Sequence, residues 1–406
     1  MNIWLITKYA SSIEEGFESR PFALAREFTQ KGHCCSIISS DSNHFGFYPK
    51  YKSIYNFHES FNLFVLRIRT FKYKKTASLR RIISWIDFEM KLLFAPLNKF
   101  PRPDIIIVSS LSLLTILNGL RLRRLFGAKL IFEIRDIWPL TMSAEGGYSK
   151  CHPFVLFLSW VEKRGYENSD LVVGTMPNLS KHVSKRLGVL KTRCECVPFG
   201  FDPDFFFMNP SNSSRFRIAH NLPSGKFIVG YAGSIGLSNG LDAMIDCIVN
   251  IQSDHRFLFL FLGEGACRSE YVERTKHLPN VIFLPKVKRE EVSSFLSLCD
   301  LLYFSSLKSE VWEYGWSPNK LIDYMMAGKP ILASYSGFKS MINEAESGFF
   351  IEAENPKEIN EALNRIIDIP KQELEEMGSK GRSWLIKNRK WQVLAEQYLS
   401  LMKQIH

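Results

Sequence analysis

The feature that most constrains this chain is an alternation of short apolar runs with amphipathic stretches, and the alternation occurs twice. In the first half, apolar runs at residues 3–6, 34–39, 105–108 and 130–134 alternate with stretches of helical period at 22–31 and 114–126. Strands that are apolar throughout and joined by helices are typical of a parallel sheet covered on both faces. The first half is therefore predicted to be an α/β domain.

The second half restarts the same pattern. Apolar runs at 227–232, 257–262, 281–284, 301–304, 331–333 and 349–351 predict a sheet of about six strands, with a helix over 241–251. The connecting segment 202–224 is rich in Pro, Asn, Ser and Phe and has no period, so we place the domain boundary there. Residues 384–405 read as one amphipathic helix. A length of 406 residues suits two domains of about 200 residues each.

The net charge of +11 is concentrated in the first half. Residues 1–200 contain 29 Lys and Arg against 16 Asp and Glu, whereas residues 201–406 contain 23 against 25. An excess confined to one half indicates a polyanion or an anionic membrane surface as its partner. Segment 66–102 mixes ten basic residues with aromatic and aliphatic ones at helical spacing, which favours an interfacial helix on anionic lipid over a nucleic-acid platform. The alternative is the basic face of an ordinary folded helix.

Other parts of the composition narrow the class of protein. The eight cysteines are irregularly spaced with no CxxC pair, and the nine histidines show no HxH or HxxxH spacing. A disulfide scaffold and a zinc site are therefore not expected, and a reducing cytosol is the simpler environment. No uncharged apolar run reaches the roughly 18 residues of a membrane helix. We expect no metal and no membrane span.

Residues just after strands are the candidates for a site, because ligands of open α/β sheets bind beyond the carboxyl ends of the strands. With two such domains, we expect the site in a cleft between them. A glycine-rich stretch follows the strand at 227–232, and Gly-Glu-Gly follows the strand at 257–262. Glycines let the backbone approach a phosphate, although ordinary strand-to-helix turns would look the same. The candidates are Gly233, Ser234, Gly236, Asn239, Gly263, Glu264 and Gly265.

A further candidate is the stretch Ser317-Pro318-Asn319-Lys320, where proline suits the first turn of a helix. A lysine in that turn opposes the helix dipole unless an anion is bound, so Lys320 is predicted to hold an anion such as a diphosphate. A solvated surface lysine is the alternative. Arg135 and Asp136 follow the strand at 130–134 and would point into the cleft, unless they form a purely structural pair.

In their order and spacing these features resemble a known family. The segments that carry the resemblance are Gly16-Phe17-Glu18-Ser19-Arg20-Pro21, Lys31-Gly32-His33, Val197-Pro198-Phe199-Gly200-Phe201-Asp202, Phe261-Leu262-Gly263-Glu264-Gly265 and Ala327-Gly328-Lys329-Pro330. They resemble glycosyltransferases of the GT-B fold, glycosyltransferase family 4. The Ser-Pro-Asn-Lys-Leu form is similar to the branch that builds bacterial surface polysaccharides, including N-acetylfucosamine transferases.

The resemblance implies two Rossmann-like domains facing a central cleft. Residues 1–205 would bind the acceptor, residues 206–383 would bind a nucleotide-sugar donor, and a helix over 384–406 would pack back on the first domain. The implied reaction is a retaining, metal-independent transfer from a UDP-sugar to a polyprenyl-diphosphate-linked or oligosaccharide acceptor. Its implied setting is O-antigen, lipopolysaccharide or capsule synthesis by a cytoplasmic enzyme, peripheral on the inner face of the membrane, with no cofactor and no nucleic acid.

The resemblance also suggests residue roles, with departures from the family pattern. Two glutamates usually hold the donor; here Asp323 takes the second place and Gly315 the first, while Glu310 and Glu313 lie out of register. Ser234 and Asn239 replace the usual arginine and lysine of the glycine stretch, so Lys320 and the loop N–H groups are inferred to meet the diphosphate. The implied catalytic residues are Arg135, Asp136, Lys320 and Glu310, the donor side adds Ser317, Pro318, Asn319 and Asp323, and Gly16 and Arg20 belong to the acceptor side. A nucleotide-sugar epimerase of the same fold and a non-catalytic basic binding module are the alternatives.

Overall fold

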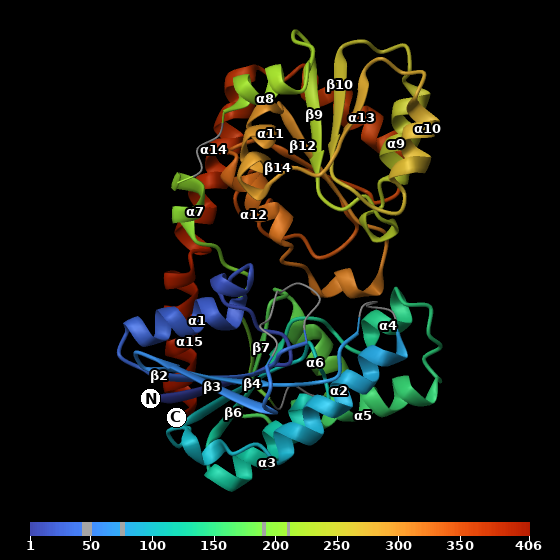
Figure 1. Ribbon diagram of the computed structural model, residues 1–406. Helices are drawn as coiled ribbons and strands as arrows, with labels where there is room; N and C mark the ends of the chain where they lie inside the picture. The colour runs from blue at the N-terminus through green and yellow to red at the C-terminus, as the bar shows by residue number, and fades with distance from the viewer. Residues whose placement is uncertain (43–50, 74–77, 189–191, 209–211) are drawn as a thin grey trace. The chain divides into compact units, whose positions relative to one another are not determined.

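The computed structural model describes residues 1–42, 51–73, 78–188, 192–208 and 212–406 (Figure 1). The chain divides into two compact units, and each is described by itself. The first unit comprises Met1–Gly200 together with Trp391–His406, and the second comprises Phe201–Lys390.

The first unit is built on an eight-stranded sheet with the order β3-β4-β2-β1-β5-β6-β7-β8 in the described residues. All neighbouring strands are parallel except the edge pair β3 and β4, which is antiparallel. The strands are β1 (Asn2–Ile6), β2 (Cys34–Ser40), β3 (Tyr55–Ser60), β4 (Leu63–Ile68), β5 (Ile105–Ser109), β6 (Lys129–Ile134), β7 (Leu171–Gly174) and β8 (Cys194–Cys196).

Helices cover both faces of this sheet. They are α1 (Arg20–Gln30), α2 (Leu79–Leu93), α3 (Thr115–Phe126), α4 (Leu140–Ala144), α5 (Pro153–Asn168), α6 (Leu179–Leu187) and α15 (Trp391–Ile405). Helices α1 and α15 contact each other and pack with alternate strand residues such as Ile3, Ile37 and Ile107 in one buried cluster. Trp4, on the opposite face, meets Phe126 at the end of α3, and α2 and α5 flank α3. Both faces are therefore dry, as the apolar runs of the sequence predict.

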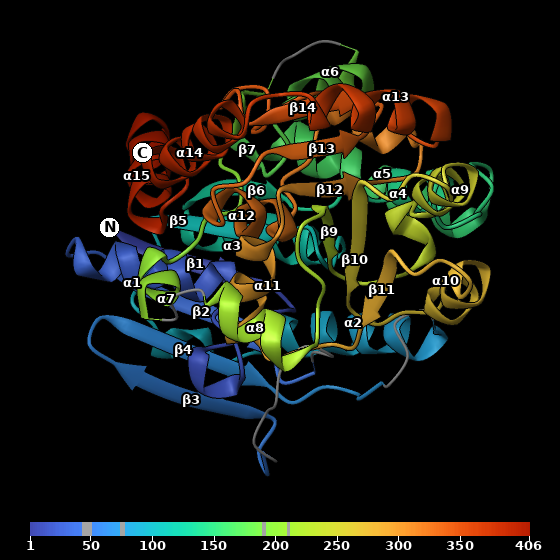
Figure 2. The same cartoon turned by 90° about the horizontal axis from the view of Figure 1, so that it is seen from above.

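The second unit contains a six-stranded parallel sheet with the order β11-β10-β9-β12-β13-β14 (Figure 2). Its strands are β9 (Phe227–Ala232), β10 (Phe257–Leu262), β11 (Val281–Leu284), β12 (Leu301–Ser305), β13 (Ile331–Ser334) and β14 (Gly348–Ile351). Its helices are α7 (Pro203–Met208), α8 (Ser213–Ala219), α9 (Asp242–Asn250), α10 (Arg268–Thr275), α11 (Val292–Leu298), α12 (Asn319–Met326), α13 (Pro356–Ile367) and α14 (Lys371–Asn388). The prediction of two doubly wound α/β domains is thus confirmed.

The prediction of one continuous helix from residue 384 to 405 was wrong. Helix α14 ends at Asn388, and α15 begins at Trp391. The break coincides with a backbone bridge in which the N–H of Phe201 donates to the carbonyl of Arg389 at 3.1 Å. A backbone carbonyl bonded to a distant strand-like residue no longer accepts from its own helix, so the helix stops there without a proline or glycine.

Segment 66–102, predicted to be an interfacial helix, is only partly helical. Its first residues belong to β4, and helix α2 begins at Leu79. Arg67, counted among the basic residues of that segment, is buried and forms an ion pair with Glu15. Lys74 and Lys75 of the same segment lie outside the described residues, as do residues 209–211 of the predicted interdomain connection. All eight cysteines are free thiols, and none of the described helices is long and apolar enough to cross a membrane.

Candidate active site

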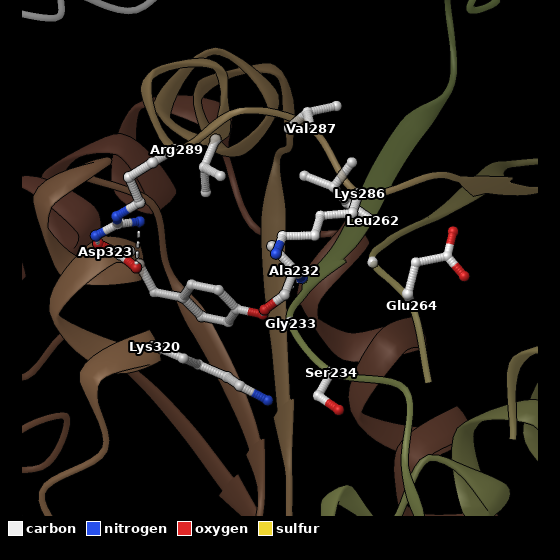
Figure 3. Close-up of a pocket in the computed structure, with 13 residues that line it drawn as sticks. Ala232, Gly233, Ser234, Leu262, Glu264, Lys286, Val287, Arg289, Lys320 and Asp323 are labelled. Atoms are coloured by element: carbon white, nitrogen blue, oxygen red, sulfur yellow. Dashed lines mark hydrogen bonds and ion pairs between the residues drawn. The ribbon is translucent and has the colours of Figure 1, made fainter. Parts of the chain in front are cut away.

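The second unit contains a cavity of about 630 Å³ beyond the carboxyl ends of its strands (Figure 3). Its walls come from the ends of β9 and β10, from the segment after β11, and from the first turns of α12. The lining residues are Ala232, Gly233, Ser234, Leu262, Gly263, Glu264, Lys286, Val287, Arg289, Val292, Lys320, Asp323 and Tyr324. The size and the position are those of a small-molecule site in an open α/β sheet.

Two glycines allow the loops after β9 and β10 to meet at the edge of this cavity. Gly233 has a φ of +153° and Gly263 a φ of +145°, a backbone conformation that other residues rarely adopt. A Cβ atom on Gly263 would lie 1.9 Å from the carbonyl oxygen of Gly233, and one on Gly233 would lie 2.9 Å from Cε of Lys320. Both positions therefore require glycine, and the close approach brings Lys320 against the backbone of the first loop.

Lys320 is a cation whose partners are all neutral. Its Nζ donates to the hydroxyl oxygen of Tyr231 and to Oδ1 of Asn239, both at 2.8 Å, and lies over the rings of Tyr231 and Phe304. Among the described residues, no carboxylate lies within ion-pair distance of it. Burial lowers the pKa of Lys320 to about 8. An ammonium group held without a counter-ion at a cavity wall is suited to bind an anion.

Asp323, one turn further along α12, faces the same cavity. Its two carboxylate oxygens bond to both terminal nitrogens of Arg289, with Nη1 at 2.9 Å from Oδ2 (Figure 3). Burial raises the pKa of Asp323, and the Arg289 guanidinium counteracts that rise. The pair therefore holds a carboxylate in a fixed orientation at the wall of the cavity, where it can accept hydrogen bonds from a ligand.

Tyrosine hydroxyl groups tie helix α12 and the loop after β9 to the strand. The hydroxyl of Tyr324 accepts from the N–H of Ala232 at 2.8 Å and donates to its carbonyl at 3.1 Å. The hydroxyl of Tyr231 donates to the carbonyl of Ser234 at 2.6 Å. Both tyrosines are buried. They fix the position of Lys320 relative to the glycine loop, and sequence analysis missed both because each reads as an ordinary core aromatic.

Some N–H groups of the glycine loop that were inferred to meet a diphosphate are already used within the protein. The N–H of Gly233 donates to Leu262 at 3.0 Å, and the N–H of Ile235 donates to Glu264 at 2.9 Å. The N–H of Ser234 has no hydrogen-bond acceptor among the described residues. The N–H groups of Gly236, Leu237 and Ser238 likewise have no acceptor among the described residues, but of these four residues only Ser234 lines the cavity.

The structure brings some predicted donor residues to the cavity and leaves others aside. Gly233, Ser234, Gly263, Glu264, Lys320 and Asp323 line it, and Asn239 reaches it by bonding to Lys320. Gly236, Gly265, Ser317, Pro318, Asn319 and Glu310 do not line it. Pro318 precedes α12 rather than starting it, because the first helical residue is Asn319. The Glu264 carboxylate points away from Lys320 (Figure 3).

Four residues that line the cavity were not predicted from the sequence. They follow the end of β11 or face it. They are Lys286, Val287, Arg289 and Val292. The rule that ligands bind after strand ends applies to the segment after Leu284 as well as to the two glycine loops, so it could have identified Lys286. The pairing of Arg289 with Asp323 carries no local signal, because 34 residues separate them.

The predicted residues of the first unit differ in how exposed they are, because Arg135 is half-buried whereas Asp136 and Gly16 are exposed. The backbone N–H of Arg135 donates to Ser110, and its guanidinium lies over the ring of Phe199. Asp136 is exposed. Gly16 is also exposed and ends a short 3-10 helix with a φ of +112°. Their roles toward a reacting sugar or an acceptor stay predictions.

Arg20, predicted on the acceptor side, is buried inside the first unit. Its Nε donates to Glu133 Oε1 at 2.9 Å, and its terminal nitrogens donate to the carbonyls of Val197 and Pro198. The Arg20 side chain has no exposed surface. Such a guanidinium holds the end of the first unit in place, and direct contact with an acceptor is not expected from this geometry.

No group of three or more His, Cys, Asp or Glu residues that could hold a metal ion occurs in the part of the chain that the structure describes. Two doubly wound units, one with a cation-bearing cavity beyond its parallel strands, are the architecture expected of the GT-B class of glycosyl-transferring enzymes. The family model "Glycosyltransferase Family 4" matches residues 15–205, and the model "Glycosyl transferases group 1" matches residues 212–384. The chain is a glycosyltransferase of the GT-B fold.

Individual relatives are distant. TuaH of Bacillus subtilis (strain 168), a glycosyltransferase named for teichuronic acid biosynthesis, is 20% identical to this chain over 274 residues. The match covers 67% of this chain and 66% of TuaH, so this chain spans just under two thirds of the length of TuaH. Sucrose-phosphate synthase from Thermosynechococcus elongatus superimposes with a TM-score of 0.74 at 16% identity, covering 100% of this chain and 98% of that one. An E. coli trehalose-6-phosphate structure bound with UDP-2-fluoro glucose gives 0.75 at 11% identity, with both chains covered completely.

Proposed function

We propose that this enzyme transfers a sugar from a UDP-sugar donor bound in the cavity of the second unit. The observation that carries the proposal is Lys320, a half-buried ammonium group at the cavity wall with only neutral partners. The diphosphate of a nucleotide sugar supplies the missing counter-charge. The bound UDP-2-fluoro glucose of the E. coli structure and the UDP-glucose of an Anabaena structure with the same fold support a uridine nucleotide.

In this proposal different residues of the cavity bind different parts of the donor. Lys320 and the N–H of Ser234 meet the diphosphate, and Asp323, held by Arg289, accepts the ribose hydroxyls. The segment from Lys286 to Val292 lines the remaining wall and would face the base. As the diphosphate departs, negative charge grows on its oxygens, and a preorganised ammonium stabilises that charge without a metal. Retention of configuration and independence of metal follow from the family resemblance and stay proposals.

For the acceptor we propose a polyprenyl-diphosphate-linked sugar or an oligosaccharide of a bacterial surface polysaccharide, such as an O-antigen or a capsule. The name of TuaH supports a cell-surface polysaccharide. From the resemblance of the Ser-Pro-Asn-Lys-Leu form we propose a donor sugar of the N-acetylfucosamine type. Arg135, Asp136 and Glu310 are the residues we propose near the reacting sugar.

A lipid-linked acceptor would require the enzyme to meet a membrane, and the surface of the first unit supports this. Helices α2, α3 and α5 lie in a row and expose large apolar side chains: Ile83, Ile86, Met90, Leu93, Leu117, Leu125, Leu156, Phe157 and Trp160. The same helices contain eight Lys and Arg and four Asp and Glu. One of the four acidic residues, Glu162, is buried. Basic and apolar side chains on one layer of helices are typical of a peripheral surface on anionic lipid.

Flotation with anionic vesicles tests the membrane proposal. Full-length protein should float with phosphatidylglycerol vesicles at low salt and be released at about 0.5 M salt, where charges are screened. Trp160→Ser together with Phe157→Ser should weaken flotation, whereas Ile218→Ser, which is more exposed but lies on the second unit, should not. Failure of the unsubstituted protein to float at low salt would contradict the proposal.

The reaction is tested by titrating UDP into the purified enzyme and then assaying a panel of UDP-sugars with and without acceptor. Saturable UDP binding with turnover that depends on acceptor supports the transferase. Conversion of the donor sugar without acceptor would instead indicate an epimerase. A protein that binds vesicles but no UDP would be the non-catalytic module, and the proposed donor site would be wrong.

A further inference from the structure

The second unit contains another cavity. It lies at the amino ends of the strands of the same sheet, whereas the donor cavity lies beyond their carboxyl ends. It has a volume of about 360 Å³ and lies where strands begin rather than end. Phe227, the first residue of β9, lines it, whereas Ala232, the last residue of that strand, lines the donor cavity. The two cavities are therefore separate sites at opposite ends of the strands of one sheet.

The charged side chains of this second cavity leave two lysines without counter-ions. Lys226, Lys329 and Lys371 line it, together with Asp300 and Glu375. Lys371 pairs with Glu375 at 3.7 Å, and Oδ2 of Asp300 accepts from the backbone N–H of Ile228 at 2.8 Å. Among the described residues, Lys226 and Lys329 have neither a hydrogen bond nor an ion pair, although both are half-buried.

The remaining wall is apolar. Phe227, Pro330, Ile367, Ile369 and Leu374 form it, and two of these residues are buried. A free inorganic ion would fill little of such a cavity and would leave this wall in contact with water. Lysines at two separate points beside an apolar wall match a small organic anion, with a charged group near the lysines and an apolar body on the wall.

We propose that this cavity binds a phosphate monoester with an apolar body, at a site distinct from the donor site. Lys226 and Lys329 would meet its phosphate, while the carboxylate of Asp300 disfavours ligands with a second negative charge on the body. The second cavity also lies beyond the C-terminal end of α12, the helix that contributes residues to the donor cavity. Helix α12 begins at Asn319, places Lys320 and Asp323 at the donor cavity, and ends at Met326, three residues before Lys329. A ligand bound to Lys329 is thus placed to shift the helix that holds the donor.

Phenyl phosphate is a suitable probe, and ligand-observed NMR with the full chain measures its binding. Saturating UDP is added to fill the donor site. We expect saturable binding of phenyl phosphate that UDP leaves in place, and no binding of the uncharged analogue phenol. In the double variant Lys226→Gln and Lys329→Gln, the affinity should fall at least tenfold. The matched control is Lys357→Gln, an exposed lysine on α13 outside the cavity, which should bind as the unsubstituted protein does.

Two outcomes would overturn the proposal. Displacement of phenyl phosphate by UDP would mean that the probe had bound only in the donor site. Unchanged binding by the double variant would mean that the two lysines do not form the site. Circular dichroism and UDP affinity of the double variant establish that it is folded, since neither lysine lines the donor cavity. The test is also independent of the proposed transferase reaction, because it requires no turnover.

Discussion

Arg20, which is buried, and Lys320, which is half-buried, are two cations in the first turns of helices, one in each unit. Arg20 begins α1 and Lys320 is the second residue of α12, and each has a proline within two residues. A cation at this end of a helix opposes the helix dipole. Arg20 is compensated inside the protein by Glu133 and two backbone carbonyls. Lys320 has only the neutral oxygens of Tyr231 and Asn239.

This difference separates a structural cation from a binding one. A buried charge is costly unless it is paired, so the protein pairs Arg20 permanently and gains a fixed junction between α1 and β6. Lys320 bears part of that cost in the free enzyme, which is why its pKa falls to about 8. An anionic ligand removes the cost when it binds. The local sequence signal is the same in both cases, and only the partner distinguishes them.

The largest effect should come from breaking the Arg20 pair. Arg20→Met leaves the Glu133 carboxylate buried without its counter-ion, which typically costs about 3–5 kcal/mol of unfolding free energy. Chemical denaturation measures this loss. The double variant Arg20→Met with Glu133→Leu removes both charges and should recover most of the stability. A single variant as stable as the unsubstituted protein would show that the pair does not hold this junction.

Removing Lys320 should act on catalysis rather than on folding. Lys320→Ala is expected to lower turnover on the order of 10²–10³-fold and to weaken UDP binding, because the departing diphosphate loses its cation. The denaturation midpoint should stay the same or rise, since an uncompensated buried charge has been removed. Calorimetric UDP titration and a donor-turnover assay measure the two effects, with Lys320→Arg as the variant that keeps the charge. Near-normal turnover of Lys320→Ala would contradict the proposed role of Lys320 as the cation that stabilises the departing diphosphate.

Sequence analysis predicted the features of this molecule that depend on local patterns. The two parallel sheets follow from apolar runs, and the glycines at 233 and 263 follow from their places after strands. The position of Lys320 in the first turn of a helix was read correctly from Pro318 and Asn319, with a shift of one residue in the helix start. These inferences need only neighbouring residues, so a single sequence is enough for them.

The features that sequence analysis missed depend on distant partners. Arg67 looked like a surface cation because its partner Glu15 is 52 residues away and the strand that contains Arg67, β4, was not predicted. The break between α14 and α15 comes from a backbone bond to Phe201, which no helical pattern contains. Arg20 was placed on the acceptor side by family resemblance, and its pairing with Glu133, 113 residues away, carries no local signal. Charge and periodicity indicate what a residue needs, but the fold decides which group supplies it.

The pH dependence of UDP binding should sharpen the assignment of Lys320. Its pKa of about 8 in the free enzyme lies below the ordinary lysine value of 10.5 because of burial, so the bound diphosphate must stabilise the protonated form. Affinity should be nearly constant around pH 7 and fall above pH 8, by up to about tenfold per pH unit. Titration calorimetry between pH 7 and 10 measures the fall and the accompanying proton uptake. Lys320→Arg should show no such fall, and a fall that persists in that variant would assign the titration to another group.

The smallest effect concerns the pair of Arg289 and Asp323, which is half exposed on the arginine side. Because water screens such a pair, Arg289→Gln should cost no more than about 1 kcal/mol of stability. Its effect on UDP should be larger at low pH. Burial raises the pKa of Asp323 and Arg289 lowers it, so removal of the guanidinium raises that pKa further and protonates the carboxyl sooner as pH falls. The ratio of UDP affinities of the two proteins should therefore be a few-fold larger at pH 5.5 than at pH 7.5. Taking the ratio at each pH cancels the titration of UDP itself, and a ratio that does not change with pH would show that the Asp323 carboxylate takes no part in holding the ribose.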